Sequence, residues 1–337
     1  MIAKFPKFST LDLDSLKEIR EFTALLPSYT EFNVTNMFVW DVMQPVMVSM
    51  LNDNLVAKFI DVNTKEYYYS LIGINKINES IHDLFELSLA DGHIPELKTV
   101  PQLVLEHLKS DENIEVEEDD ANHDYILSVA ELANFSSEKF GKKRNMVKHF
   151  HATYPNNKIE ELDLSLPENV DLIRQVLQKW ETKLGLGTQE IIVEFTAIEK
   201  AMQYSKDLNI RCFATFVDDV IEAFTIFEHI DEKNVVLHFE KANRKLSGVY
   251  ENQKHHLAKH LAEKGIETIN YGQDLGYEGL RRAKMSYHPI QFHRKYTVKH
   301  KKAHDYAPSH TPHKRAASRE SHASILHKAP HKAHAVI

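Results

Sequence analysis

The sequence predicts an α+β fold made of two tandem lobes, each a mixed sheet flanked by helices. Three observations lead to this expectation. At 337 residues the chain exceeds the length that one compact core usually serves, so two domains are expected. Its hydrophobic share of 42% and charged share of 27% are those of a globular protein rather than of a disordered chain. The third observation is a regular order of helices and strands in the second half.

That second half alternates between helical and strand periodicity. Two helices precede three strands, which are joined by the dipeptide Asp218–Asp219 and by a polar turn at 231–233, both suited to hairpins. A helix that ends before Gly265 and a buried strand follow, and a short helix begins near Gly276. In chain order the expected ranges are 167–183, 190–206, 209–217, 220–230, 233–241, 248–264 and 267–271.

This order is that of the GNAT acyltransferase core, in which a splayed sheet receives an acyl donor beside its fourth strand. The first half is less regular and is a candidate for a second, degenerate copy. Its expected elements are strands at 55–60, 67–72 and 124–129, helices at 80–90, 100–109 and 137–153, and an acidic loop at 111–120 around one short strand. We therefore expect an N-terminal lobe at 1–155, a C-terminal lobe at 156–297 and a tail at 298–337.

The net charge of −8 is divided unevenly between the body and this tail. Residues 298–337 hold eight Lys/Arg and two acidic residues, a charge of +6, which leaves −14 for the rest. The tail also carries eight of the 21 histidines and little apolar surface, so we expect it to be disordered. It is a candidate for electrostatic attraction to RNA or to an anionic membrane surface. A solvated extension without a specific partner is an equal alternative.

The expected location is the cytoplasm. No window approaches the run of about 18 apolar residues that a membrane span needs, and the N-terminus lacks the apolar run of a secretory signal. The one cysteine, Cys212, lies in the apolar run IRCFATFV, so a buried strand thiol is expected rather than a nucleophile. A chain with one cysteine fits a reducing compartment.

Glycines concentrate in one stretch. Glycine permits positive φ and a close approach of the backbone to a ligand. Gly248 follows a strand and opens a helix, where free amide groups and the helix dipole favour an anion, and Arg244 and Lys245 precede it. The segment KANRKLSG is therefore a candidate phosphate-binding turn, with an ordinary strand-to-helix turn as an equal alternative. Five of the ten glycines lie in this stretch: Gly248, Gly265, Gly272, Gly276 and Gly279.

A second candidate segment, NYGQDLGYEGLRRAKMSYHP at 270–289, gathers charged residues around three glycines. Glu278 and Arg282 lie four apart and share a face of the expected helix. A carboxylate held by arginine can position an amine or accept a proton, and arginine can bind phosphate or carboxylate through two hydrogen bonds. The alternative is a set of surface pairs, each worth about 0–1 kcal/mol. The candidate residues are Asp274, Glu278, Arg281, Arg282, Lys284, Tyr287 and His288.

The segment GKKRNMVKHF at 141–150 makes one end of a helix strongly basic beside an acidic body. Helices of this kind bind phosphate backbones, including tRNA stems, although short basic runs are more often solvated faces. Its basic residues are Lys142, Lys143, Arg144 and Lys148.

Histidines in the helix at 248–264 suggest a metal site at first sight, because His256 and His260 lie four apart. No H-E-x-x-H arrangement accompanies them, and Lys254 and Lys259 lie on the same side. We therefore expect a solvated face, which also includes His255, and no metal site in the chain.

Several motifs together resemble a bacterial family, the proteins similar to the C-terminal domain of phosphatidylglycerol lysyltransferases. The resemblance rests on EFNVTNMFVW, KFGKKRNMVKHF, GVYENQ, the segment at 270–289 and HRKYTV, and it covers residues 1–298. It implies a tandem pair of GNAT-like lobes, similar to Fem-type aminoacyltransferases. It also implies attack by an amine or hydroxyl on an activated ester delivered as aminoacyl-tRNA or acyl-CoA. The matching residues are Lys142, Lys143, Arg144, Asn145, Asp274, Gly276, Gly279, Leu280, Lys284, Tyr287 and Pro289.

Two features depart from the patterns of these families. The chain has no membrane portion, so a lipid acceptor would be reached from the cytosol. The candidate phosphate turn reads R-K-L-S-G, with one glycine where GNATs that use CoA have the pattern Q/R-x-x-G-x-G/A. Acyl-CoA and aminoacyl-tRNA therefore both stay open as donor substrates, and no cofactor is assigned.

The function expected from the sequence is that of an acyl- or aminoacyltransferase with an amine or hydroxyl acceptor, a phospholipid headgroup among the candidates. The donor is expected along Arg244–Tyr250, with Asp274 and Glu278 orienting the nucleophile and Tyr287 as candidate proton donor to the leaving group. Arg281, Arg282 or Lys284 would bind phosphate or carboxylate. The alternatives are a non-catalytic module of the same fold that binds a ligand, and an RNA-binding protein.

Overall fold

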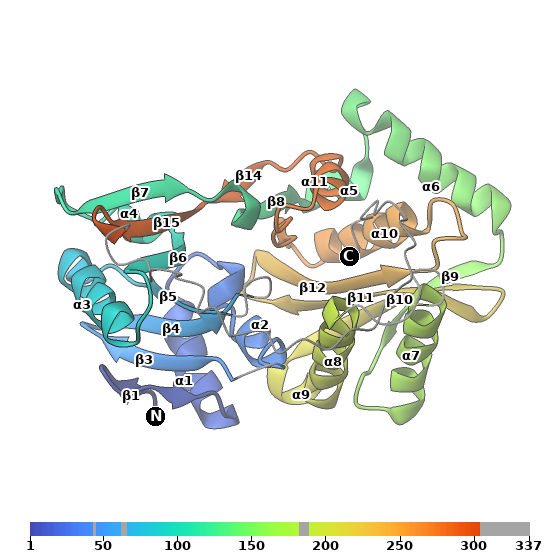
Figure 1. The fold of residues 1–337 in the computed structure, drawn as a ribbon. Coiled ribbons are helices and arrows are strands. Elements are labelled where there is room, and N and C mark those ends of the chain that lie inside the picture. The colour runs from blue at the N-terminus through green and yellow to red at the C-terminus, as the bar shows by residue number, and fades with distance from the viewer. Residues whose placement is uncertain (43–44, 62–65, 182–188, 304–337) are drawn as a thin grey trace, which may run out of the picture.

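The computed structural model describes residues 1–42, 45–61, 66–181 and 189–303. The polypeptide forms two mixed sheets that lie side by side, with helices on their faces (Figure 1). Among the described residues, no helix is both long enough and apolar enough to cross a bilayer.

The first sheet has the strand order β1-β3-β4-β5-β6-β15-β7, with β2 paired to β3. Helices α1, α2, α3 and α4 accompany it. The strands are β1 (Ala3–Lys4), β2 (Ser9–Thr10), β3 (Met47–Leu51), β4 (Asn54–Ile60), β5 (Tyr67–Ile72), β6 (Glu96–Pro101), β7 (Ile114–Glu118) and β15 (Lys295–His300), and the helices are α1 (Leu13–Thr23), α2 (Val34–Val39), α3 (Ile77–Ala90) and α4 (Gln102–Leu105).

The second sheet has the order β14-β8-β13-β12-β11-β10-β9. Its strands are β8 (Asp124–Ser128), β9 (Asn157–Leu162), β10 (Ile210–Val217), β11 (Val220–His229), β12 (Asn234–Ala242), β13 (Thr268–Asn270) and β14 (Gln291–His293). Its helices are α5 (Val129–Asn134), α6 (Gly141–Thr153), α7 (Pro167–Glu181), α8 (Gln189–Gln203), α9 (Ser205–Leu208), α10 (Val249–Glu263) and α11 (Glu278–Met285). Short 3₁₀ turns lie at Thr30–Phe32, Asp120–Asn122 and Glu138–Phe140.

Both sheets are built on the same plan. Three antiparallel strands lead into a helix, and the strand after that helix pairs in parallel with the third strand. The helix is the crossover that a parallel pair requires. In the first sheet the series is β3, β4, β5, α3 and β6, and in the second it is β10, β11, β12, α10 and β13. The repeat that the sequence only suggested is therefore present as topology.

Each half of the chain gives one strand to the sheet of the other half. Strand β8, from the first half, pairs with β13 in the second sheet. Strand β15, at the end of the described chain, lies between β6 and β7 in the first sheet, and Figure 1 shows this red strand beside the teal β7. Helices α5 and α6 also pack on α10. The expected boundary at 155/156 therefore does not separate the two sheets.

A shared core joins the lobes. Phe32, Val48 and Leu55 from the first half belong to the same buried cluster as Ile173 and Phe224 from the second half. Separate apolar clusters lie between α10 and its sheet and between α3 and its sheet. Because the central cluster contains residues from both sheets, the lobes form one packed body.

Local signals explain the hairpin between β10 and β11. Asp218 and Asp219 both adopt positive φ, 48° and 61°, and Val217 pairs with Val220 across them. Two central residues with positive φ define the type I′ turn, which matches the twist of the flanking strands. The hairpin expected at this dipeptide is confirmed.

Two expected boundaries are wrong. The helix expected at 100–109 is only Gln102–Leu105, because Pro101 ends strand β6 and the residues after α4 form no regular helix. The disordered tail was expected to begin at 298, but β15 continues to His300 and Val298 is fully buried. The rest of that predicted tail, residues 304–337, lies outside the described part of the chain.

Candidate functional site

The second sheet opens between β12 and β13. These strands pair at only three positions, the last being Val236 with Asn270, although β12 continues to Ala242. At His238 the register with β11 also shifts, because Ile226 faces Phe239 while Phe227 faces Leu237. His238 is thus the extra residue of a β-bulge, a feature that turns a side chain out of the regular ladder and is common beside active sites.

Charged and phenolic side chains fill this opening. Lys254 of α10 bonds Glu240 of β12 at 2.7 and 2.9 Å, and only 1% of the lysine side chain is exposed. Tyr271, just after β13, donates its hydroxyl to the same carboxylate at 3.0 Å, and its ring lies 3.9 Å from the Lys254 Nζ. Burial lowers the pKa of Lys254, and burial and the Glu240 charge raise the pKa of Tyr271.

Tyr287 closes one side of the opening. Its ring lies 3.9 Å from Nζ of Lys143 on α6 and 5.1 Å from Nζ of Lys254. Lys143 in turn bonds Glu251 of α10 at 3.1 Å. Burial, followed by the charges of Glu251 and Glu240, raises the pKa of Tyr287 well above 10, so its phenol stays protonated at neutral pH.

Asp274 lies behind Tyr271 and is fully buried. It accepts hydrogen bonds from the Tyr125 hydroxyl at 2.5 Å, from Arg281 Nε at 2.7 Å and from the Gly276 amide at 2.8 Å. Burial alone would raise its pKa, but the hydrogen bonds from Arg281 and Tyr125 outweigh burial and lower it. Asp274 is therefore an ionised group that holds α11 to β8.

Lys284 of α11 lies between this carboxylate and the opening. Its Nζ donates to the Tyr271 carbonyl and lies 4.8 Å from the Tyr271 ring and 5.8 Å from the Tyr125 ring. Burial lowers the pKa of Lys284 to about 7, against the attraction of Asp124 and Asp274.

The same polar network continues to the junction of the two sheets. Lys295 of β15 bonds Asp124 of β8 at 2.7 Å and also pairs with Glu31, and no part of the lysine side chain is exposed. Thr30 and Asn270 supply further hydrogen bonds to Asp124. The strand exchange thus brings a lysine of one sheet against an aspartate of the other. Burial raises the pKa of Glu31, which shares its lysine with Asp124.

The bulge residue His238 is held from both lobes. Its Nδ1 lies 2.9 Å from Asn36 of α2 and its Nε2 lies 3.0 Å from Glu228 of β11. The ring is completely buried, so these two partners fix its orientation.

The expected donor turn lies beside the network, but its glycine has another role. Arg244 stacks on Trp180 at 5.6 Å, Lys245 is exposed, and the Tyr250 hydroxyl accepts the Ala242 amide at 3.2 Å. Gly248 has φ 84°, and a Cβ there would lie 2.6 Å from the Met146 carbonyl oxygen of α6. Glycine is needed at this point for the close packing of α6 on the start of α10.

The other residues expected at the site do not lie together in the structure. Glu278 and Arg282 share a helix face as expected, 3.8 Å apart, but 82% and 74% of their side chains are exposed. The arginine that holds a buried carboxylate is Arg281, not Arg282. Of the residues expected to act on α6, Lys143 and Arg144 point inward, the latter to the Phe135 carbonyl, and the other three face solvent: Lys142, Asn145 and Lys148.

The face of α10 that was expected to be solvated is partly covered, although Lys259 is exposed. Lys254 is 1% exposed, and His255 stacks on Phe135 and reaches the Leu132 carbonyl at 2.8 Å. His256 lies 3.5 Å from His151 of α6. The expectation failed because α5 and α6, which lie far away in sequence, cover this side of the helix.

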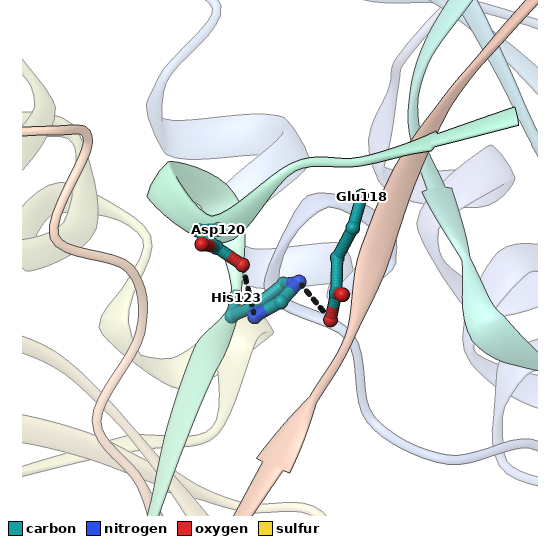
Figure 2. A group of neighbouring side chains, drawn as sticks. All are labelled: Glu118, Asp120 and His123. Carbon is teal, nitrogen blue, oxygen red and sulfur yellow. Dashed lines mark ion pairs between the residues drawn. The ribbon is translucent and has the colours of Figure 1, made fainter.

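A cluster with metal-ligand residue types lies at the crossover from β7 to β8 (Figure 2). The His123 ring stands between two carboxylates, with Nε2 3.7 Å from Glu118 and Nδ1 3.9 Å from Asp120. Its Nε2 also lies 3.3 Å from the Lys295 carbonyl, and Arg294 lies 3.3 Å from Glu118. Because different ring nitrogens face the two acids and a cation already pairs with Glu118, the geometry is that of an ion-pair bridge across the crossover.

Two surface hollows lie away from the polar network. One is formed by the turn after β11 and the end of α10, including His229, Lys233 and Gly265. The other lies between β9 and α9, including Asp163 and Asn209. Apart from Gly265, which follows the end of α10, neither contains a residue that the sequence singled out for function, so the candidate site remains the opening between β12 and β13.

Comparison with known proteins identifies the family of the chain. Residues 23–299 match the model of the family described as phosphatidylglycerol lysyltransferase, C-terminal. The chain belongs to this family. Its fold is α+β, with two mixed sheets of the same plan and helices on their faces. No curated protein shows significant sequence similarity to the chain.

Solved structures of other proteins share the fold. A conserved protein of unknown function from Bacteroides thetaiotaomicron is 26% identical, with a TM-score of 0.75 over 89% of this chain and 100% of that one. The C-terminal domain of a candidate lysylphosphatidylglycerol synthetase from Agrobacterium fabrum is 14% identical, with a TM-score of 0.60 over 87% and 93%. L-PGS from Bacillus licheniformis is also 14% identical, with a TM-score of 0.57 over 89% and 94%.

Within this family fold, sequence reasoning missed most of the buried network. The missed residues are Glu31, Asp124, Tyr125, Glu228, His238, Glu240, Glu251, Lys254, Tyr271 and Lys295. One signal was available: the strand β12 reads NVVLHFEKA, with His238, Glu240 and Lys241 inside an otherwise apolar run. Ionisable residues in a buried strand need partners, which marks them as structural or functional pairs.

Proposed function

We propose that this protein is a transferase that moves an activated acyl or aminoacyl group from aminoacyl-tRNA or acyl-CoA to an amine or hydroxyl acceptor. A phospholipid headgroup is among the acceptors to test. The observation that carries the proposal is the open strand pair β12–β13, with its bulge at His238 and, inside it, the ion pair of Glu240 with the buried Lys254 and the partly buried Tyr271. Family membership supports the same reaction class.

The opening suits acyl transfer by positioning. A bulge leaves a backbone amide out of the ladder, where it can bind the carbonyl oxygen of an ester. The buried ion pair Glu240–Lys254 and the protonated Tyr271 then provide fixed dipoles in a site of low dielectric. Proximity of an amine and an ester in such a site supplies most of the acceleration, so no covalent nucleophile is required.

In this proposal the donor lies along the turn that precedes α10. Arg244 and Lys245 bind its phosphate groups, with Arg244 supported by the buried ring of Trp180 and the partly exposed Tyr250 at the start of α10. Tyr287 donates a hydrogen bond within the site, because its raised pKa keeps the phenol protonated. Asp274 has a positioning role, since its oxygens are bonded to Arg281, Tyr125 and Gly276, and the exposed Glu278 pairs with Arg282 at the surface.

A thermal-shift panel on the full chain tests the donor. The probes are acetyl-CoA, a long-chain acyl-CoA, aminoacylated and uncharged tRNA, and vesicles of phosphatidylglycerol. A donor that binds the folded state raises Tm with its concentration. The shift should be lost in Arg244→Ala and kept in the control Arg174→Ala, whose arginine forms surface pairs with Asp171 and Glu199. A flat response to every donor would contradict the proposed function.

The exposed side of α6 provides the proposed contact with a nucleic-acid donor. This helix has no acidic residue and presents Lys142, Asn145 and Lys148 to solvent. Each phosphate contact adds about 0.9 to the slope of log affinity against log salt concentration. The double variant Lys142→Ala/Lys148→Ala should therefore lower the slope for tRNA by about 2. The matched exposed pair Lys4→Ala/Lys7→Ala should leave it unchanged, and equal slopes in all three proteins would exclude α6 as the tRNA contact.

A non-catalytic ligand-binding module on the same fold is the alternative, and the filled opening favours it. Lys254, Glu240 and Tyr271 are bonded to one another inside the opening, so the acyl group of a donor would have to fit beside them. Turnover distinguishes a transferase from a binding module. A transferase releases tRNA or CoA when donor and acceptor are mixed, whereas a binding module is stabilised by the donor and releases nothing.

A further inference from the structure

One buried lysine differs from the others in its partners. Among residues whose surroundings the structure describes, four lysines are buried. Lys241 pairs with Glu194 at 2.6 Å, Lys254 with Glu240 at 2.7 Å, and Lys295 with Asp124 at 2.7 Å. No carboxylate in the described structure lies within ion-pair distance of the fourth lysine, Lys284, whose Nζ donates to the Tyr271 backbone carbonyl.

Every element packed around Lys284 contributes a charge that is already paired. Strand β8 brings Asp124, bound to Lys295 of β15, and the loop before α11 brings Asp274, bound to Arg281. Helix α10 brings Lys254, bound to Glu240. Lys284 therefore lies in a buried environment in which the ammonium has no counter-ion of its own, since Asp124 shares Lys295 with Glu31 and Asp274 is bonded to Arg281. A lysine in such an environment gives up its proton near neutral pH, and its pKa is lowered to about 7.

A neutral Lys284 has a defined hydrogen-bond geometry. One N–H donates to the Tyr271 carbonyl, at the point where the chain leaves β13 and the opening begins. The amine keeps its lone pair for a second group. Phosphate binding, the role expected from the sequence, requires a charged ammonium instead, and here that charge is disfavoured by burial.

We propose that Lys284 is the proton acceptor of the transfer reaction, taking the proton from the attacking amine or hydroxyl at the inner end of the opening. This inference rests on the proposed function. The acceptor nitrogen or oxygen forms a bond to the ester carbonyl carbon, and its proton passes to Lys284 Nζ. The bond from that carbon to the leaving oxygen or sulfur then breaks. Lys284 returns the proton to the leaving group and ends the cycle neutral.

The first test asks whether Lys284 is neutral, independently of any activity. An unfolded lysine has a pKa of about 10.4, so between pH 7 and pH 10 the unfolded chain binds one more proton than the folded chain. Stability therefore rises with pH in this window. From pH 7 to pH 9 the unfolding constant of the wild type should fall by about 50-fold relative to that of Lys284→Met.

Chemical denaturation of the two proteins at both pH values measures this difference. The control is Lys241→Met, whose lysine is equally buried but paired with Glu194, and its difference from the wild type should not change between pH 7 and pH 9. Parallel curves for wild type and Lys284→Met would overturn the inference, whatever the protein transfers.

The second test separates a base from an anion-binding group by activity. Arginine keeps the positive charge but does not lose its proton in proteins. With aminoacyl-tRNA or acetyl-CoA as donor and glycerol as acceptor, Lys284→Arg and Lys284→Met should both lose about 10²- to 10⁴-fold in kcat. With hydroxylamine, which is already deprotonated and nucleophilic at pH 7, both variants should keep activity within about tenfold of the wild type.

The outcomes distinguish the two proposals. An active Lys284→Arg, or equal losses with glycerol and hydroxylamine, would overturn the role of proton acceptor and leave the transferase proposal intact. A wild-type protein that transfers nothing to either acceptor from either donor would overturn the transferase proposal and the catalytic role together, and the pH test would then report only on the charge state.

Discussion

The two lobes place chemically different side chains on the same frame. Helices α3 and α10 both begin after a residue with left-handed backbone, Lys76 with φ 43° and Gly248 with φ 84°. Counted from these residues, corresponding positions are buried in both helices. Ile77 corresponds to Val249, Phe85 to Leu257, and Ile81 to Gln253, and all six are at most 3% exposed. At the position of Lys254, which is 1% exposed, α3 has His82, with 40% of its side chain exposed.

This difference shows that, in the described part of the chain, buried charged groups, which lower stability unless they are paired, are retained under α10 and not under α3. The core under α3 is apolar, and such a core stabilises the fold by about 25 cal/mol for each Å² removed from water. The core under α10 contains Gln253, Lys254 and Glu251, and each buried polar group lowers stability unless a partner satisfies it. One lobe therefore acts mainly as scaffold, and the other carries the candidate chemistry. Three predictions test this division, from the largest expected effect to the smallest.

Removal of the buried charge in α10 should have the largest effect. Lys254→Met leaves Glu240 buried without its cation and should lower the free energy of unfolding by about 3–5 kcal/mol. Its counterpart in the first lobe, His82→Met, removes a half-exposed pair with Asp111 and should cost less than about 1 kcal/mol. Urea denaturation of both variants measures the two effects.

The double variant Lys254→Met/Glu240→Gln is the control for this prediction. It removes both charges but keeps an acceptor for the Tyr271 hydroxyl, so it should recover at least half of the lost stability. If Lys254→Met and His82→Met are equally stable, the two lobes do not differ in the way that we infer.

The starts of the two helices should respond in opposite directions. Gly248→Ala puts a Cβ 2.6 Å from the Met146 carbonyl at a positive φ, and should lower the free energy of unfolding by about 1–3 kcal/mol. Lys76→Gly removes the strain of a non-glycine residue in the left-handed region and adds no steric contact. It should raise the free energy of unfolding by less than about 1 kcal/mol. Thermal denaturation of the pair provides the comparison, and a Gly248→Ala variant as stable as the wild type would show that α6 can move away from this turn.

Acid should lower the free energy of unfolding through His256 of α10, which has no ionisable counterpart in α3. This residue corresponds to the fully buried Leu84 of α3, and burial lowers its pKa to about 4. Between pH 6.5 and pH 4 the unfolded chain binds more protons at this site than the folded chain, so stability falls as pH falls. Because the ring is partly exposed, the effect should be about 1 kcal/mol. Relative to wild type, His256→Leu should gain this amount on acidification, and a pH-independent difference would contradict the assignment.

Much of the fold was predictable because its signals are local. The Asp218–Asp219 dipeptide predicted a hairpin, and both residues adopt the positive φ that its turn requires. Gly248 was correctly placed at the start of a helix, but the sequence did not show why glycine is needed there. The Met146 carbonyl that a Cβ would meet lies 102 residues earlier in the sequence, and only packing brings it to this point. The polar surface of α10 was wrongly predicted to be solvated for the same reason, because α5 and α6 cover it.

By itself the sequence determined the order and type of most elements from α7 to α11, the burial of Cys212 and the family to which the chain belongs, because periodicity, turn residues and motifs are properties of neighbouring residues. Tertiary structure decided which charges meet. The exchange of β8 and β15 between the sheets brings Asp124 to Lys295, and the crossover through α10 brings Lys254 to Glu240. Such pairs form between residues far apart in the chain, and their pKa values follow from burial, which no local pattern specifies.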